Sequence, residues 1–331
     1  MADESYGIRL ARSEDDPSIL ELLRLSLGDG GAIPRTREYW HWKHRQNPFG
    51  ESPILVAESD NQLVGIRVFL RWTWMFKGER VAAVRAVDTA THPDWQGRGI
   101  FTKLTLRLAQ EIKDQGTSLI FNTPNSKSRP GYIKMGWHNA GRVSLWGYAK
   151  RPWASLTPRK GSVGSLESGG SPVEGLVDSY QWKAKPVDGR LATLKTEDYL
   201  RWRYCANPAF EYRAAWVEDG ESAVGLIWRV RQRGRLVELR ICELLVGPDR
   251  SSKRAARRIL LQLMRETQAD YLVAMAAPGT PEMNVLARSG FLPIPKLGPV
   301  FTLRLLDEDR DLGNPQKLSG WRLSIGDLEL F

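Results

Sequence analysis

The chain has 331 residues, more than one ordinary domain holds, so two domains are expected. Its hydrophobic share of 42% and charged share of 26% are those of a globular protein rather than a disordered or fibrous one. The formal net charge of +10 favours anionic partners.

Membrane insertion and secretion are not expected. No apolar run approaches the roughly 18 residues that cross a bilayer, and the acidic, polar start Met1–Ser5 does not resemble a secretory signal. The two cysteines, Cys205 and Cys242, form no CxxC pair, and no histidine cluster accompanies them. The sequence therefore predicts no disulfide framework, no metal site and a cytoplasmic location.

The first part of the chain alternates helices and strands. A strand over Ile8–Ala11 precedes a helix that Asp15 or Asp16 caps, with Pro17 in its first turn. A second helix is expected from Thr36 to Arg45. Three strands follow, near residues 54–58, 62–74 and 81–91, with Asp, Asn and Gly in the connecting turns.

A glycine-bearing loop joins the third of these strands to an amphipathic helix, which has Phe101, Leu104, Leu108 and Ile112 on one face. The centre of the loop reads Gln96, Gly97, Arg98, Gly99 and Ile100. A strand, a glycine loop and a helix start together offer backbone N–H groups and a helix dipole to a phosphate. Gly97 and Gly99 let the main chain approach an anion, and Arg98 adds a charged donor.

A second motif lies downstream. Leu119–Asn122 reads as a short buried strand, and residues 123–130 form a loop that enters another helix. This helix carries Tyr132 and ends at Gly136 and Trp137.

Together the two motifs resemble the GNAT N-acetyltransferase superfamily. The coenzyme A pyrophosphate loop of that family reads Gln/Arg-x-x-Gly-x-Gly/Ala, and Gln96, Gly99 and Phe101 fall on its positions, with Phe101 replacing the usual small residue. The second family motif is matched by Asn125, Ser128, Tyr132, Gly136 and Trp137. The resemblance implies an α/β fold with a mixed sheet and acetyl-CoA as the co-substrate.

The chain also repeats itself. Tyr39, Trp42 and Asn47 recur 160 residues later as Tyr199, Trp202 and Asn207, and Gly136 recurs 154 residues later as Gly290. This register indicates a duplicated domain. We therefore expect two tandem GNAT folds, a catalytic one over 1–150 and a degenerate one over 176–331, with a flexible Ser/Gly/Pro-rich linker over 151–175.

The second copy has lost the residues that carry chemistry. Ser251–Arg254 stands where the first copy has Gln96–Gly99, and Leu286 stands where it has Tyr132. We expect this half to bind no acetyl-CoA and to wall the acceptor cleft. The apolar C-terminal segment from Trp321 is expected to dock onto the body of the protein.

The resemblance implies a role for each candidate residue of the first half. Main-chain groups of Ala90 and Thr91 would hold the pantetheine arm and polarise the thioester, and the loop Gln96–Ile100 would bind the pyrophosphate. Asn125 and Ser128 would order their loop or bond the cofactor. Tyr132 would act as general acid and protonate the leaving thiolate.

The general base has several candidates. Asp88 lies on the strand before the loop, and an exposed or ion-paired aspartate is the alternative interpretation. Further candidates are His92, Glu38, His41 and the terminal carboxylate of Phe331. The first half has no cysteine to form an acyl-enzyme, so direct attack in a ternary complex is expected.

The sequence thus predicts an acetyl-CoA-dependent N-acetyltransferase that modifies a primary amine of a small molecule or an amino sugar. A non-catalytic acyl-CoA-binding protein and an aminoacyl-tRNA-dependent transferase of tandem-GNAT type are the alternatives. Nucleic acid is not the expected partner, because the basic hairpin Arg229–Arg235 is expected to have a solvated arginine face without interleaved aromatic residues. No membrane partner is expected, and a homodimer is left open.

Overall fold

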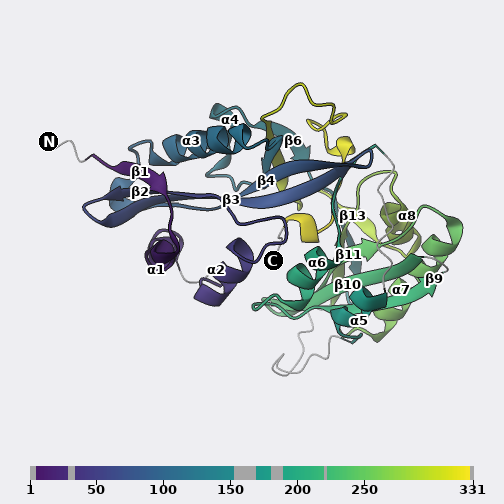
Figure 1. Cartoon of the computed structure of the whole chain (residues 1–331). Coiled ribbons are helices and arrows are strands. Elements are labelled where there is room, and N and C mark those ends of the chain that lie inside the picture. Colours follow the sequence, from purple (N-terminus) through teal and green to yellow (C-terminus); the bar gives the residue numbers. More distant parts are fainter. Residues whose placement is uncertain (1–4, 29–33, 153–168, 180–188, 220–221, 329–331) are drawn as a thin grey trace.

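The computed structural model describes residues 5–28, 34–152, 169–179, 189–219 and 222–328, and these form two mixed sheets with helices on their faces (Figure 1). The larger sheet contains β1 (Gly7–Leu10), β2 (Ile54–Ser59), β3 (Gln62–Phe76), β4 (Glu79–Thr91), β5 (Leu119–Asn122), β6 (His138–Arg142), β8 (Leu191–Thr193), β14 (Val300–Leu305) and β15 (Trp321–Arg322). The smaller sheet contains β7 (Leu145–Ala149), β9 (Arg213–Asp219), β10 (Ser222–Arg233), β11 (Leu236–Leu245), β12 (Tyr271–Met275) and β13 (Leu292–Ile294). The expected α/β class is confirmed.

Helices cover both faces of the larger sheet. In the first half, α1 (Asp16–Leu27) and α2 (Arg37–His44) lie on one face, and α3 (Ile100–Asp114) and α4 (Arg129–Lys134) lie on the other (Figure 1). The helices of the second half are α5 (Val173–Ser179), α6 (Glu197–Leu200), which a π-helical turn continues (Arg201–Cys205), α7 (Arg250–Glu266) and α8 (Pro281–Arg288). None of the helices in the described ranges is long and apolar enough to cross a bilayer.

The two sheets exchange strands. β14, from the second half, lies between β5 and β6, with Leu303 opposite Phe121. β7, from the first half, lies between β12 and β13, with Gly147 opposite Val273. The sheets therefore do not coincide with the expected divisions 1–150 and 176–331. Each half supplies a strand whose backbone N–H and C=O groups complete the ladder of the other.

The duplication is visible at the contact between the halves. The Trp42 and Trp202 rings stack with centroids 5.0 Å apart. Each indole Nε1 donates to the main-chain oxygen of the other tryptophan, at 2.8 Å and 2.9 Å. Thr36 and Thr196 cap equivalent helices in the same way, each accepting the N–H three residues later. These reciprocal contacts place a pseudo-twofold axis between the two tryptophans.

The predicted linker is shorter than expected at its C-terminal end. Residues 153–168 lie outside the described part of the chain. Ser171, however, forms a bridge to Ala214, and α5 begins at Val173, whose side chain is buried. The spacing of Val173, Leu176 and Val177 was the available signal for this helix.

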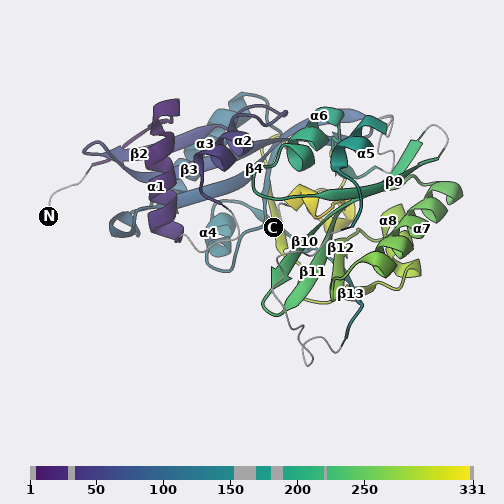
Figure 2. The same ribbon diagram turned by 90° about the horizontal axis from the view of Figure 1, so that it is seen from below.

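The C-terminal segment docks as expected. Trp321 is fully buried, and β15 pairs in parallel with β8. Ile325 and Leu328 are also buried, and the described chain ends between the two halves of the molecule (Figure 2). Phe331 lies outside the described residues.

The hairpin of β10 and β11 is less basic on its surface than expected. Arg229 is only 6% exposed and lies over the Phe210 ring, and Arg231 pairs with Glu238 at 2.8 Å. The prediction of a solvated arginine face is therefore wrong for these two residues, because β10 and β11 are central strands that lie between β9 and β12.

Candidate functional site

The site is built where β4 and β5 separate. The two parallel strands pair only from Ala83 and Leu119 to Arg85 and Phe121. β5 ends at Asn122, whereas β4 continues to Thr91. The last residues of β4 therefore have no β5 residue opposite them, which leaves an opening in the pairing of the sheet.

A β-bulge redirects β4 at this opening. Val68 of β3 lies opposite Val87, whereas Ile66 lies opposite Ala90, so β4 contains one extra residue between these pairs. Asp88, at the bulge, has a positive φ of 37°. Such bulges re-aim side chains and are common beside active sites.

Ala90 and Thr91 are the last two residues of β4 and lie just beyond the bulge. Ala90 is buried against the face that carries α1. The main-chain oxygen of Thr91 accepts hydrogen bonds from Ser26 Oγ (3.2 Å) and Gln96 Nε2 (3.4 Å). In this conformation, a ligand that bonds the Thr91 carbonyl must share it with these donors or displace them.

The glycine loop is exposed at the start of α3. Gly97 and Gly99 have φ values of +80° and +77°, and a Cβ built on either would meet no atom within 4 Å. Gly99 is the N-cap of α3 and has no side chain to satisfy the first N–H groups of the helix. Ile100, by contrast, is buried and anchors the helix start against Gly65. The loop therefore offers open main-chain donors on a rigid base.

Arg98 is held beside this loop rather than over it. Its guanidinium lies 4.4 Å from the centroid of the Trp95 ring, and Nη2 donates to the Asp94 main-chain oxygen at 3.3 Å. The Gln96 side chain points back to β4 through its bond to Thr91.

Asn125 and Ser128 shape the turn that enters α4. Asn125 Oδ1 accepts from the N–H groups of Lys127 and Ser128, both at 2.9 Å, and from Ser128 Oγ at 3.1 Å. Of the two roles predicted for these residues, the described contacts fit the ordering of the loop.

Tyr132 lies on α4, and its ring packs against Phe101 of α3. Its side chain is 3% exposed and packs between the rings of Phe101 and Trp137, with centroids 5.5 Å and 5.2 Å away. Its phenol oxygen accepts a hydrogen bond from Arg67 Nη1 at 2.7 Å. Because an arginine only donates, this contact leaves the phenol proton available.

Arg67 was not identified from the sequence. It is fully buried on β3, and its Nε and Nη2 atoms have no hydrogen-bond partner among the described residues. The guanidinium lies 4.7 Å from the Phe69 ring centroid. An arginine within the apolar strand Leu63–Leu70 was the only sequence signal.

Asp88 faces α2, on the opposite side of the sheet. Its carboxylate pairs with Lys43 Nζ at 2.8 Å and His44 Nε2 at 3.0 Å, and both partners are buried. Burial alone would raise the pKa of Asp88, but the Lys43 charge and the His44 hydrogen bond outweigh it and hold that pKa well below its usual range. A general base works best with a pKa near the operating pH, so the contacts support the ion-paired alternative.

Asp88→Asn should destabilise the fold by about 3 kcal/mol, because Lys43 is left buried without its counter-charge. The lowered pKa means that this stabilisation is complete above the unfolded carboxyl pKa of about 3.9 and is lost as the pH falls further. Chemical denaturation from about pH 7 to about pH 3 measures the difference, which should shrink at the acid end. The matched control is Asp311→Asn, which removes an exposed pair with Lys77 and should change stability little. A difference that does not depend on pH would contradict the ion-pair explanation.

The other candidates for the general base do not lie together where β4 and β5 separate. His92 Nδ1 accepts from the Asp94 N–H at 3.3 Å, and Glu38 and His41 are exposed on α2. The C-terminal segment comes closer, because the Leu328 oxygen accepts a hydrogen bond from Arg85, where the pairing of β4 and β5 ends. Phe331, three residues further on, is outside the described residues.

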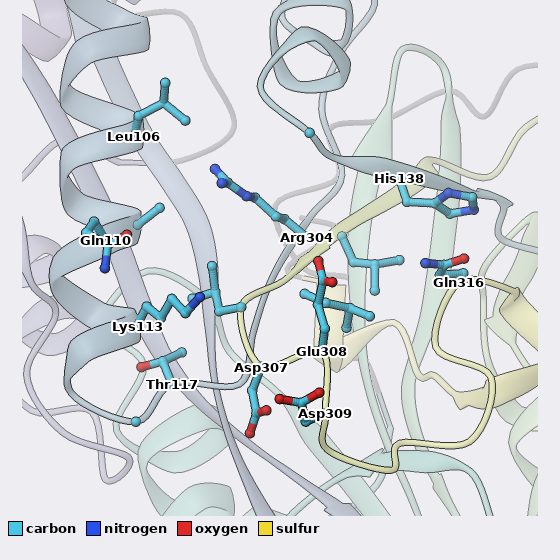
Figure 3. A pocket seen from close by; sticks show the side chains of 16 residues that line it. Leu106, Gln110, Lys113, Thr117, His138, Arg304, Asp307, Glu308, Asp309 and Gln316 are labelled. Atoms are coloured by element: carbon cyan, nitrogen blue, oxygen red, sulfur yellow. The ribbon is translucent and has the colours of Figure 1, made fainter.

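A cavity of about 1010 Å³ lies along α3 (Figure 3). It is lined by the second half of α3 and by the end of β14 with the residues that follow. Lys113 projects from α3, whereas Arg304 comes from β14 and Asp307, Glu308 and Asp309 come from the residues that follow it (Figure 3). It lies along α3 from Leu106 onward and is separate from the candidate site at Ile100.

No group of His, Cys, Asp and Glu side chains within the described ranges is arranged to hold a metal ion.

Comparison with known proteins finds solved structures that are similar over both halves of this chain. Residues 7–140 match the model of the acetyltransferase (GNAT) domain family. No curated protein sequence matches the chain. A probable N-acyltransferase of unknown function from Enterococcus faecalis has a solved structure with a TM-score of 0.67 at 14% identity, over 92% of this chain and 73% of that one.

Two further solved structures are similar. A GCN5-related N-acetyltransferase from Anabaena variabilis has a TM-score of 0.63 at 16% identity, over 91% of this chain and 73% of that one. Eis1 from Mycobacterium abscessus has a TM-score of 0.56 at 14% identity, over 92% and 74%. At such low sequence identity, the similarity to these three structures shows the fold alone.

Proposed function

We propose that this chain, whose residues 7–140 match the model of the acetyltransferase (GNAT) domain family, moves an acetyl group from acetyl-CoA to a primary amine. The proposed acceptor is a small molecule or an amino sugar, and the proposed location is the cytoplasm. The observation that carries this proposal is the open glycine loop at the start of α3, next to the separation of β4 and β5.

The residues of the loop fit the diphosphate of coenzyme A. Main-chain N–H groups from Gly97 to Phe101 are presented at a helix N-terminus, where the dipole favours negative charge. No protein atom lies within 4 Å of the Cβ positions of Gly97 and Gly99, so an anion bound there would not clash with the protein. The pantetheine arm would then follow β4 past the bulge, toward Ala90 and Thr91.

Tyr132 is the proposed proton donor. The bond from Arg67 fixes the phenol oxygen without consuming its proton. As the amine attacks the thioester carbonyl directly, the C–N bond would form, the C–S bond would break and the leaving thiolate would take the phenol proton. The proton that the amine loses would pass to solvent, which would reprotonate the phenolate. Because Phe101 packs against the Tyr132 ring, the ring of Phe101 must turn aside before a thioester can reach the phenol.

A second candidate is an acyl-CoA-binding protein without turnover. The burial of Tyr132 favours it, as does the occupied carbonyl of Thr91. Both candidates use the same loop, and they differ only in whether the thioester is consumed.

A thiol-release assay with acetyl-CoA and a panel of small amines and amino sugars separates the two candidates. We expect release that at least one amine accelerates beyond the hydrolysis seen without an acceptor. Calorimetric binding of coenzyme A without any accelerated release would support the non-catalytic candidate. Absence of both binding and release would contradict the family-based function altogether.

A further inference from the structure

A second recess lies between α7 and α8, in the half that lacks the glycine loop. Its volume is about 490 Å³, and five of its lining side chains are cationic. The lining residues are Arg250, Lys253, Arg254, Arg257, Asn284, Val285 and Arg288. No carboxylate is among them, in contrast to the mixed charges of the cavity in Figure 3.

The positive charges of this recess face no carboxylate in the part of the chain that the structure describes. Within the described residues, none of the five cations forms an ion pair with a carboxylate. One of them instead joins the two helices, because Arg257 Nε donates to the Arg288 main-chain oxygen at 3.0 Å. Five like charges gathered in one recess repel one another and attract anions.

The start of α7 is closed to a ligand by the chain itself. Asp249 caps the helix, and its Oδ1 accepts from the Ser252 N–H at 2.8 Å and from Ser251 Oγ at 2.6 Å. In the first half the cap is Gly99, without a side chain. An anion in the second half must therefore be held by side chains and not by the helix start.

The recess exists because a large side chain is missing. Phe101 is the second residue of α3, and its ring reaches across to Gly131 of α4. Ser251 is the second residue of α7 and is too short to reach α8 in this way. The gap between the helices remains open, with the buried Val285 at one side.

We propose that this recess binds a compact ligand that carries two or more phosphate groups. Arg250 and Arg257 are seven residues apart on α7, which spans about 10 Å at a rise of ~1.5 Å per residue, so more than one phosphate can be contacted. Guanidinium groups bind phosphate oxygens through paired hydrogen bonds. No aromatic side chain lines the recess, which disfavours single-stranded nucleic acid that stacks its bases. The site is independent of the proposed acetyl transfer.

Calorimetry with inorganic tripolyphosphate at low salt, on the full chain, tests this proposal. We expect one tripolyphosphate to bind at this site, with an affinity that falls about tenfold or more in Arg254→Glu. The matched control is Arg258→Glu, which makes the same charge change on an exposed residue of α7 outside the lining. This control should bind almost as well as the unaltered chain.

Two further measurements show whether any bound tripolyphosphate lies in this recess. Gly99→Asp, which adds a carboxylate to the loop of the first half, should leave the tripolyphosphate site intact. Loss of this binding in Gly99→Asp, or equal weakening by Arg254→Glu and Arg258→Glu, would overturn the proposal. The proposal is also overturned if a short RNA duplex binds while tripolyphosphate does not, since the recess would then belong to a nucleic-acid surface.

Discussion

Gly99→Asp should weaken coenzyme A binding by about a hundredfold or more, which corresponds to ~2.7 kcal/mol. The substitution gives α3 the same kind of cap that α7 has, where the Asp249 carboxylate already accepts the N–H of Ser252. A carboxylate at this position would occupy the donors meant for the diphosphate and would repel its charge. Isothermal titration with coenzyme A measures the loss.

The fold should tolerate this change. Gly99 has a φ of +77°, and a Cβ there meets open space, so the expected cost is that of an aspartate in the left-handed region, about 1 kcal/mol. The matched control is Gly78→Asp in the turn between β3 and β4, where φ is +87° and the space is equally open. Full coenzyme A affinity in Gly99→Asp, together with an unchanged melting temperature, would place the cofactor elsewhere.

The starts of α3 and α7 show how the two copies of the domain differ. The second half differs from the first both in its cap residue and in a shorter connection before the helix, since α7 already begins at Arg250. The expected pairing of Ser251–Arg254 with Gln96–Gly99 is therefore displaced, and Asp249 stands in the place of Gly99. Loss of the glycine loop and gain of the arginine-lined recess occur on the same helix.

The two halves also keep one contact while changing its chemistry. His44 bonds Asp88 in the first half, and Tyr204 bonds Glu243 in the second, with the phenol donating at 2.7 Å. In the first half, neighbouring charge lowers the pKa of Asp88, whereas in the second, burial raises the pKa of Glu243. The C-terminal segment covers the second pair, because Ser324 Oγ bonds Glu243 at 3.1 Å.

Much of the local structure could be predicted from the sequence because its signals are local. The helix expected over Thr36–Arg45 is α2, whose N-cap is Thr36, and β5 spans Leu119–Asn122 as the buried run indicated. The glycine loop, the helix after it and the turn at Asn125 also follow from residues close in the chain. Turn and cap chemistry depends on neighbours within a few positions.

The long-range arrangement could not be predicted in the same way. Apolar periodicity says that β7 and β14 have a buried face, but it does not say which sheet each one joins. Likewise, the sequence left Asp88 open between a base and an ion pair. Its partners Lys43 and His44 lie on a helix more than forty residues earlier, and only the fold brings them together. The role of Arg67 could not be predicted for the same reason, because its partner Tyr132 lies 65 residues later in the chain.

Tyr132→Phe should slow acetyl transfer by about 10²–10⁴-fold while leaving coenzyme A affinity nearly unchanged, because the proposed proton donor is removed and the ring is kept. It should also destabilise the fold by about 1–3 kcal/mol. Arg67 Nη1 would lose its bond to the phenol, and the other two nitrogens of this buried guanidinium already have no partner among the described residues. Single-turnover kinetics and denaturant titration measure the two effects separately.

A second variant separates catalysis from packing. Adding Arg67→Met to Tyr132→Phe removes the buried charge as well as its partner, so most of the lost stability should return. Turnover should stay low, since no phenol proton is restored. If turnover returns along with stability, Tyr132 supports the core between Phe101 and Trp137 and donates no proton. If both variants release thiol at the original rate and keep the original stability, the Arg67–Tyr132 contact has neither role.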